Sequence, residues 1–164
     1  MSGQDHTGAG PVNARIFPIP PVVAALFAAA GWGLNLVLPL TENASKAPFE
    51  SRLGGGIIIA AALAIGGLAL LEMRRAKTSF HPGAQANAFV QSGVFSRTRN
   101  PMYLSLALIV FGLGIATANP WMVVMAALLM IYLQERVVKR EEAYLGARFG
   151  ADYEAYMKRV RRWF

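Results

Sequence analysis

The stretch MYLSLALIVFGLGIATANPWMVVMAALLMIYL, Met102–Leu133, contains no charged residue and decides the fold class. It is longer than the roughly 20 apolar residues that one membrane-crossing helix needs, and Asn119-Pro120 interrupts it. Because proline lacks a backbone N–H and disfavours helix in the preceding residue, a break is expected at this point. The stretch therefore predicts a tight hairpin of two shortish membrane helices, Met102–Ala118 and Pro120–Leu133.

Two more uncharged runs lie nearer the N-terminus, Pro20–Thr41 and Leu53–Leu71. The first is longer than the apolar core of a signal peptide, which spans roughly 7–15 residues, so we expect a retained helix. The chain is thus predicted to be an all-α integral membrane protein with about four transmembrane helices. Its predicted parts are a flexible polar tail (1–19), two transmembrane helices (20–77), and a core with the helical hairpin and a cytoplasmic amphipathic C-terminal helix (78–164).

The composition agrees with a membrane protein and excludes several kinds of site. Of the 164 residues 55% are hydrophobic and 15% are charged, whereas a soluble domain carries about 25% charged residues. The mean hydropathy is +0.40. There is no cysteine and there are only two histidines, which excludes disulfides and thiolate metal sites and argues against a histidine metal centre. No metal is therefore expected.

Most of the 16 basic residues lie in two places, the segment 74–101 and the tail after Leu133. In a four-helix arrangement both places face the same side, and the positive-inside rule puts that side in the cytoplasm together with the N-terminus. The net charge of +7 is thus interpreted as a signal of topology and lipid-headgroup contact, and no nucleic-acid partner is expected. The expected location is a bacterial inner membrane, with both termini cytoplasmic.

The segment 87–103 is rich in turn-forming residues and runs directly into the predicted helix at Pro101. A first-turn proline leaves the helix N-terminus with free N–H groups at the cytoplasmic boundary, where Arg97 and Arg99 add positive charge. This combination suits an anionic group such as a carboxylate. The alternative is a juxtamembrane anchor, in which arginines contact headgroups and Tyr103 lies in the interface.

The segment after Leu133 is expected to continue the last membrane helix into the cytoplasm. Three carboxylates in it, Glu135, Glu141 and Glu142, are candidates for holding a cationic ligand or a substrate amine. The alternative is a solvated helix with local ion pairs.

Further along, apolar residues recur at helical spacing and form one face of a helix. They are Leu145, Phe149, Tyr153, Tyr156 and Val160. Gly150 is expected to break this helix. The face is expected either to pack over the bundle as a lid or to lie in the membrane interface.

Five motifs occur in one order along residues 78 to 160. They are S-G-V-F (92–95), R-x-R-N-P-M-Y (97–103), an N-P turn between two hydrophobic segments, R-E-E (140–142) and R-F-G-x-x-Y-x-x-Y-x-x-R-V (148–160). In this order they resemble the isoprenylcysteine carboxyl methyltransferase family, which is itself similar to the membrane phospholipid N-methyltransferases. One departure is Val137, where eukaryotic members have an arginine associated with the carboxylate substrate.

The resemblance implies an integral membrane enzyme that binds S-adenosyl-L-methionine without a Rossmann domain, between its last helices and its C-terminal segment. Arg99 or Arg140 is expected to bind the cofactor's carboxylate. The expected cofactor-binding residues are Asn87, Ala88, Phe89, Val90, Phe95, Arg99, Asn100, Pro101, Met102, Tyr103 and Glu141. The expected catalytic residues are Arg140 and Glu142. If the acceptor is an amine it needs a base, for which Glu142 and Glu135 are the candidates.

The leading hypothesis is therefore a membrane-embedded, S-adenosylmethionine-dependent methyltransferase that acts on a lipophilic or amphiphilic acceptor. The acceptor is left open between carboxyl O-methylation of an isoprenylcysteine-like molecule and N-methylation of a phospholipid. The alternative is a non-catalytic membrane module that docks a partner or anionic lipid through its basic tail. A transporter is disfavoured, because the predicted spans contain no ionisable residue near their centres.

Overall fold

The computed structural model describes residues 19–40, 47–76 and 89–163. The described residues are helical and contain no strand, which confirms the predicted all-α fold. The elements in chain order are α1 (Pro20–Val37), α2 (Phe49–Arg75), a 3₁₀ turn η2 (Gly93–Ser96), α3 (Pro101–Ala116), α4 (Pro120–Leu133), a π-helical turn η3 (Gln134–Val138) and α5 (Lys139–Arg159). The predicted polar tail lies outside the described residues, apart from Ile19.

The helices α1 and α2 and the continuous helix Pro120–Arg159 are long and apolar enough to cross a membrane. Within Pro120–Arg159, α4 is the apolar part and α5 carries charged side chains, so α4 is the membrane-spanning portion. The remaining apolar helix, α3, has 16 residues and is shorter. The four predicted apolar helices are thus all present, in the predicted order.

The predicted hairpin between α3 and α4 is confirmed, and Asn119 closes it. Its side chain is only 1% exposed. The Asn119 Oδ1 accepts a hydrogen bond from Met122 N at 3.3 Å, as a helix N-cap does, and its Nδ2 donates to Gly31 O at 3.4 Å. One asparagine therefore begins α4 and also ties the hairpin to α1.

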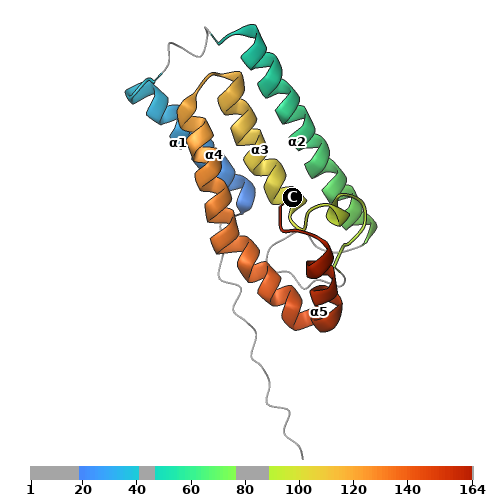
Figure 1. The fold of residues 1–164 in the computed structure, drawn as a ribbon. Coiled ribbons are helices and arrows are strands. Elements are labelled where there is room, and N and C mark those ends of the chain that lie inside the picture. The colour runs from blue at the N-terminus through green and yellow to red at the C-terminus, as the bar shows by residue number, and fades with distance from the viewer. Residues whose placement is uncertain (1–18, 41–46, 77–88, 164) are drawn as a thin grey trace, which may run out of the picture.

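Small residues let the helices approach closely, as is common in membranes. In Figure 1, α3 lies between α2 on one side and α4 on the other, with α1 packed against α4. A Cβ added at Gly55 of α2 would meet the backbone of Gly112 and Ala116 in α3, and one added at Gly31 of α1 would lie 2.9 Å from Met122 Cα. The bundle is therefore packed backbone against backbone at these points.

The chain continues from α4 through η3 into α5 without a break, which confirms the predicted extension of the last membrane helix. At Gly150 the backbone leaves the helical region (φ 50°, ψ −127°), so the predicted break is confirmed as well. The chain then folds back toward the start of α3 (Figure 1). It ends in Val160–Trp163, called here the C-terminal strap, which begins with an extended residue.

The apolar face of α5 packs onto the segment before η2. Its residues form a cluster with Phe89 and Met157, in which Tyr153 and Tyr156 are each 3% exposed. The choice between a lid over the bundle and a place in the membrane interface stays a prediction. The face is covered by protein and joins the end of α5 to the segment that leads into α3.

Candidate functional site

The turn η2 is held in place by the far end of α2. Ser92 Oγ donates a hydrogen bond to Glu72 Oε2 at 2.6 Å, and Arg75 donates to the other oxygen of the same carboxylate at 3.1 Å. Gly93 adopts a positive φ of 57°, and a Cβ there would lie 2.9 Å from the Glu72 side chain. Glu72 thus fixes the turn that precedes the arginine-rich segment.

An aromatic cluster surrounds Phe89 next to this turn. The centroid of its ring lies 4.9 Å from that of Phe149, 5.5 Å from that of Tyr153 and 5.7 Å from that of Tyr156. The Tyr156 hydroxyl also donates a hydrogen bond to Phe95 O at 2.7 Å. Two residues expected to contact the cofactor, Phe89 and Phe95, are therefore joined to the last part of α5.

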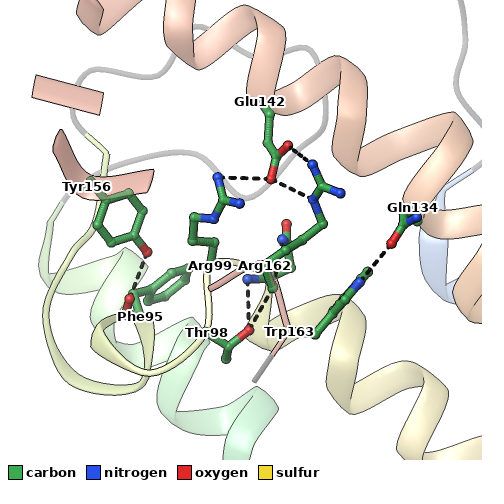
Figure 2. A network of polar contacts seen from close by, with 9 residues as sticks. Phe95, Thr98, Arg99, Gln134, Glu142, Tyr156, Arg162 and Trp163 are labelled. Carbon is green, nitrogen blue, oxygen red and sulfur yellow. Dashed lines mark hydrogen bonds and ion pairs between the residues drawn. The ribbon is translucent and has the colours of Figure 1, made fainter. Parts of the chain in front are cut away.

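The C-terminal strap crosses the segment in front of α3 and binds it through main-chain carbonyls. Arg99 N donates to Arg161 O at 3.1 Å. Thr98 Oγ1 and Asn100 Nδ2 both donate to Arg162 O, at 3.0 and 3.2 Å (Figure 2). Two of these residues, Arg99 and Asn100, were expected to bind the cofactor, and in the structure the Arg99 N–H and the Asn100 side-chain amide are engaged by the chain itself.

The strap is anchored at its other end on the π-helical turn. Trp163 Nε1 donates a hydrogen bond to Gln134 Oε1 at 3.0 Å, and the indole packs against the core formed by α1, α3 and α4. Such π-turns often occur at functional sites. The strap therefore links the start of α3 to the junction between α4 and α5.

A partly buried charge cluster lies beside the strap (Figure 2). Glu142 accepts two hydrogen bonds from Arg162, from Nε at 3.0 Å and from a terminal nitrogen at 2.7 Å. It also forms an ion pair with Arg99 at 3.2 Å, and the side chains of Arg99 and Glu142 are only 11% and 13% exposed. Three charged groups from three separate segments thus meet in a poorly solvated place.

Arg99 is incompletely paired within this cluster. Its Nε and Nη1 are buried and form no hydrogen bond to a described residue, although Nη1 lies 3.2 Å from Glu142 in the ion pair. A buried donor without an acceptor costs about 1–3 kcal/mol, and an anion placed at this edge would remove that cost. The carboxylate of an amino-acid ligand fits this position.

Glu141, next to Glu142, faces a different partner. It is partly buried and accepts a hydrogen bond from the Tyr103 hydroxyl at the start of α3. Burial raises the pKa of Glu141, and the neighbouring charge of Glu142 adds to the increase, while the Tyr103 hydrogen bond opposes it. Glu141 is therefore a poorly solvated carboxylate whose ionised form is disfavoured by burial and by the charge of Glu142.

Tyr153 interacts electrostatically with all three groups. Its pKa is raised to about 12, mainly by burial and also by the charges of Glu142 and Glu141, whereas the charge of Arg99 and a side-chain hydrogen bond with it oppose the increase. The two glutamates and Arg99 therefore form one site, at the junction of the segment before α3 with the first turns of α5.

Most of the expected site residues lie close to this junction. The structure brings together Phe89, Val90, Phe95, Arg99, Asn100, Pro101, Met102, Tyr103, Glu141 and Glu142. Arg140 is exposed on α5. Asn87 and Ala88 lie outside the described residues.

Several residues of the site were not singled out from the sequence. Arg162 and Trp163 belong to a basic tail that was interpreted as a topology signal, and Thr98, Gln134 and Glu72 carried no motif of their own. No group of three or more potential metal ligands occurs among the residues that the structure describes.

Comparison with known proteins identifies the family. The model of the phospholipid methyltransferase family matches residues 51–152, which run from the first turn of α2 to just past Gly150. The chain belongs to the phospholipid methyltransferase family. The resemblance seen in the sequence is thereby confirmed. Together with the apolar helices, membership in this family indicates an integral membrane protein and, in general terms, a methyltransferase.

Relatives add little about the function of this chain. An uncharacterised protein of Haemophilus influenzae is 39% identical over 64 residues, which are 38% of this chain and 98% of that protein. No solved structure matches the chain. The C-terminal strap lies beyond the residues that the family model matches.

Proposed function

We propose that the protein transfers a methyl group from S-adenosyl-L-methionine to a lipid-soluble acceptor at the membrane boundary. One observation carries the proposal: Arg99, whose Nε and Nη1 are buried without a hydrogen bond to a described residue, belongs to the same charge cluster as Glu142, and the next carboxylate on α5, Glu141, is partly buried and accepts a hydrogen bond from Tyr103. The amino-acid end of the cofactor carries a carboxylate and an ammonium, which are complementary to Arg99 and Glu141.

The fit of the cofactor rests on the donor and acceptor chemistry of the site. Arg99 would bind the carboxylate, and Glu141 would accept hydrogen bonds from the ammonium or the ribose. The aromatic cluster around Phe89 supplies rings for packing against adenine or for a cation–π contact with the sulfonium. When bound, S-adenosylmethionine supplies an electrophilic methyl group on a positively charged sulfur.

The work of the protein is then mainly alignment. Methyl transfer from sulfur is an in-line displacement, and holding the acceptor in line can supply up to roughly 7–11 kcal/mol of the barrier in favourable cases. A carboxylate acceptor needs no base. An amine acceptor must lose a proton, and Glu141 is the better candidate to take it, because Glu142 is engaged by Arg162 and Arg99.

The acceptor is proposed to be an amphiphile that arrives from the bilayer. Val23 and Ala24 of α1 pack with Tyr103, Leu133 and Val137 at the end of the bundle next to the site, so apolar surface leads up to the polar groups. The family name points to lipid substrates. We also propose that this end faces the cytoplasm of a bacterial inner membrane, as the positive-inside rule predicts.

The test is a transfer assay with the full-length protein in lipid nanodiscs. Radiolabelled S-adenosylmethionine is added together with a bacterial lipid extract or with small prenyl-cysteine analogues, and the labelled product is identified. We expect label in one lipid-soluble fraction and thermal stabilisation by S-adenosylhomocysteine. The absence of both effects at saturating ligand would overturn the proposal and favour a non-catalytic docking module.

Arg99→Gln sharpens the test, with Arg97→Gln as its matched control. Arg97 is exposed two residues earlier, so its replacement removes the same charge from the same segment. We expect Arg99→Gln to weaken S-adenosylhomocysteine binding by about tenfold or more, which corresponds to about 1.4 kcal/mol. Arg97→Gln is expected to change it much less.

A further inference from the structure

The C-terminal strap delivers an arginine into the charge cluster from outside the residues that the family model matches. We propose that Arg162 is a positioning residue of the methyl-transfer site: it occupies both oxygens of Glu142 and so keeps Arg99 available for an anionic group of the ligand. The inference rests on the proposed function, because the ligand concerned is the one proposed there.

Glu142 is contacted by two arginines in different ways. Arg162 forms a fork with the carboxylate, with one hydrogen bond to each oxygen at 3.0 and 2.7 Å. Such bidentate pairs are strong and fix the orientation of the carboxylate. Arg99, in contrast, approaches a single oxygen at 3.2 Å, and the contact lacks the geometry of a hydrogen bond. Arg162 is therefore the main partner of Glu142.

The charge balance of the cluster also depends on Arg162. Arg162 and Arg99 share the single negative charge of Glu142, so the three groups together keep a net positive charge, although the side chain of Arg99 is only 11% exposed. If Arg162 were absent, Glu142 would keep its negative charge and would bind Arg99 alone, through hydrogen bonds that their present 3.2 Å ion pair lacks. The Nε and Nη1 of Arg99 would then be used inside the protein, and its capacity to bind an anion would fall.

Arg162 itself is held in place by contacts of the strap on both sides. Its carbonyl accepts hydrogen bonds from Thr98 and Asn100, the residues on either side of Arg99. The next residue, Trp163, is anchored on Gln134. The strap is thus attached to the same segment that carries Arg99, so the two guanidinium groups are set relative to each other by main-chain contacts.

The test measures the dissociation constant of S-adenosylhomocysteine for full-length variants in nanodiscs, together with melting temperature. We expect Arg162→Gln to weaken binding by about tenfold and to raise the KM for S-adenosylmethionine more than it lowers kcat. Arg162→Lys keeps the charge but loses the fork, so it should fall between wild type and Arg162→Gln. Lys158→Gln removes one exposed charge from the last turn of α5 and should stay within about twofold of wild type.

A double variant separates positioning from mere structural support. If Arg162 acts by neutralising Glu142, then Glu142→Gln combined with Arg162→Gln should bind S-adenosylhomocysteine better than Arg162→Gln alone, by about threefold or more. A purely structural strap predicts no such recovery. If Arg162→Gln alone is too unstable to measure, the double variant is compared with the wild type instead, and an affinity within about threefold of wild type is the expected result.

Two results would overturn the inference while leaving the proposed function intact. One is wild-type affinity in both Arg162 variants, and the other is a double variant that binds no better than Arg162→Gln. If the wild-type protein neither binds S-adenosylhomocysteine nor transfers methyl groups, the proposed function fails instead. The two failures are therefore distinguishable.

Discussion

The membrane bundle and the cytoplasmic assembly of this protein are held together by different kinds of contact. In the bundle, glycines such as Gly55 and Gly31 bring backbones into direct contact, and Asn119 is one of its few buried polar side chains. In the assembly formed by residues 89–100, α5 and the C-terminal strap, the contacts are ion pairs, hydrogen bonds and aromatic pairs between distant segments.

Stability and function are therefore located in different regions of the molecule. Close backbone packing tolerates almost no change in volume, so the bundle is a rigid support. The assembly depends on several polar contacts of modest individual strength, and such regions open locally at lower free energy than a packed core. A ligand that must enter and leave is expected to bind in the second kind of region.

The largest effect should come from a change within the bundle. Gly55→Leu would push α2 away from the backbone of α3, and we expect it to destabilise the protein by at least about 3 kcal/mol. Melting temperature and recovery of monodisperse protein in detergent measure this. The control is Gly56→Leu, where a Cβ meets nothing within 4 Å. Equal loss in both variants would contradict the packing described for the bundle.

The next effect should be confined to the assembly. Glu142→Gln leaves Arg99 and Arg162 without their carboxylate, and hydrogen bonds to charged groups contribute about 1.5–3 kcal/mol each. We expect faster hydrogen exchange in the strap and in residues 97–100, with unchanged protection in α2 and α3. Loss of protection in the bundle as well would show that the two regions unfold as one.

A smaller effect should follow from removing one anchor of the strap. Thr98→Val deletes the hydrogen bond that Thr98 Oγ1 donates to Arg162 O and the longer one, at 3.3 Å, that it accepts from Asn100 N, for which about 1–2 kcal/mol in total is expected. The strap should then exchange its amide hydrogens several-fold faster, while the melting temperature hardly changes. Unaltered exchange in the strap would mean that its other contacts suffice to hold it.

The smallest effect should be a pH dependence that stems from Glu141. Because the pKa of this carboxyl is raised in the folded state above its ordinary value of 4.5, the folded protein binds the proton more tightly than the unfolded chain does. This contribution to stability is fully present below pH 4.5 and is lost as the pH rises through the folded-state pKa. Melting temperatures of wild type and Glu141→Gln, measured from pH 4 to 8, should therefore shift in favour of the variant at higher pH. A constant difference would speak against burial as the cause.

Much of the fold could be predicted because the features that decide it are local in sequence. The uncharged runs marked the apolar helices, Asn119-Pro120 marked the hairpin turn, and Gly150 marked the break in the last helix. Each of these signals acts on its own neighbourhood, through the missing N–H of proline or the left-handed conformation open to glycine.

The site was only partly predictable, because half of it is made by contacts between distant segments. Glu141 and Arg99 stood out as charged groups beside a helix end. Nothing local to Arg162 shows that it returns to Glu142, since that contact requires the chain to reverse at Gly150 and to run across the start of α3. The π-turn at Gln134–Val138 likewise has no composition that distinguishes it from ordinary helix.

The shortness of the hairpin has a consequence for the surrounding lipid. With 16 residues in α3 and 14 in α4, the helix α3 and the apolar part of the last helix are about 24 and 21 Å long, whereas the hydrocarbon layer of a bilayer is about 30 Å thick. A hydrophobic stretch that is shorter than the hydrocarbon layer is accommodated when the bilayer thins around the protein. Headgroups beside the hairpin should therefore sit closer to the midplane than elsewhere, so that a lipid reaching α3 has already begun to leave its normal depth.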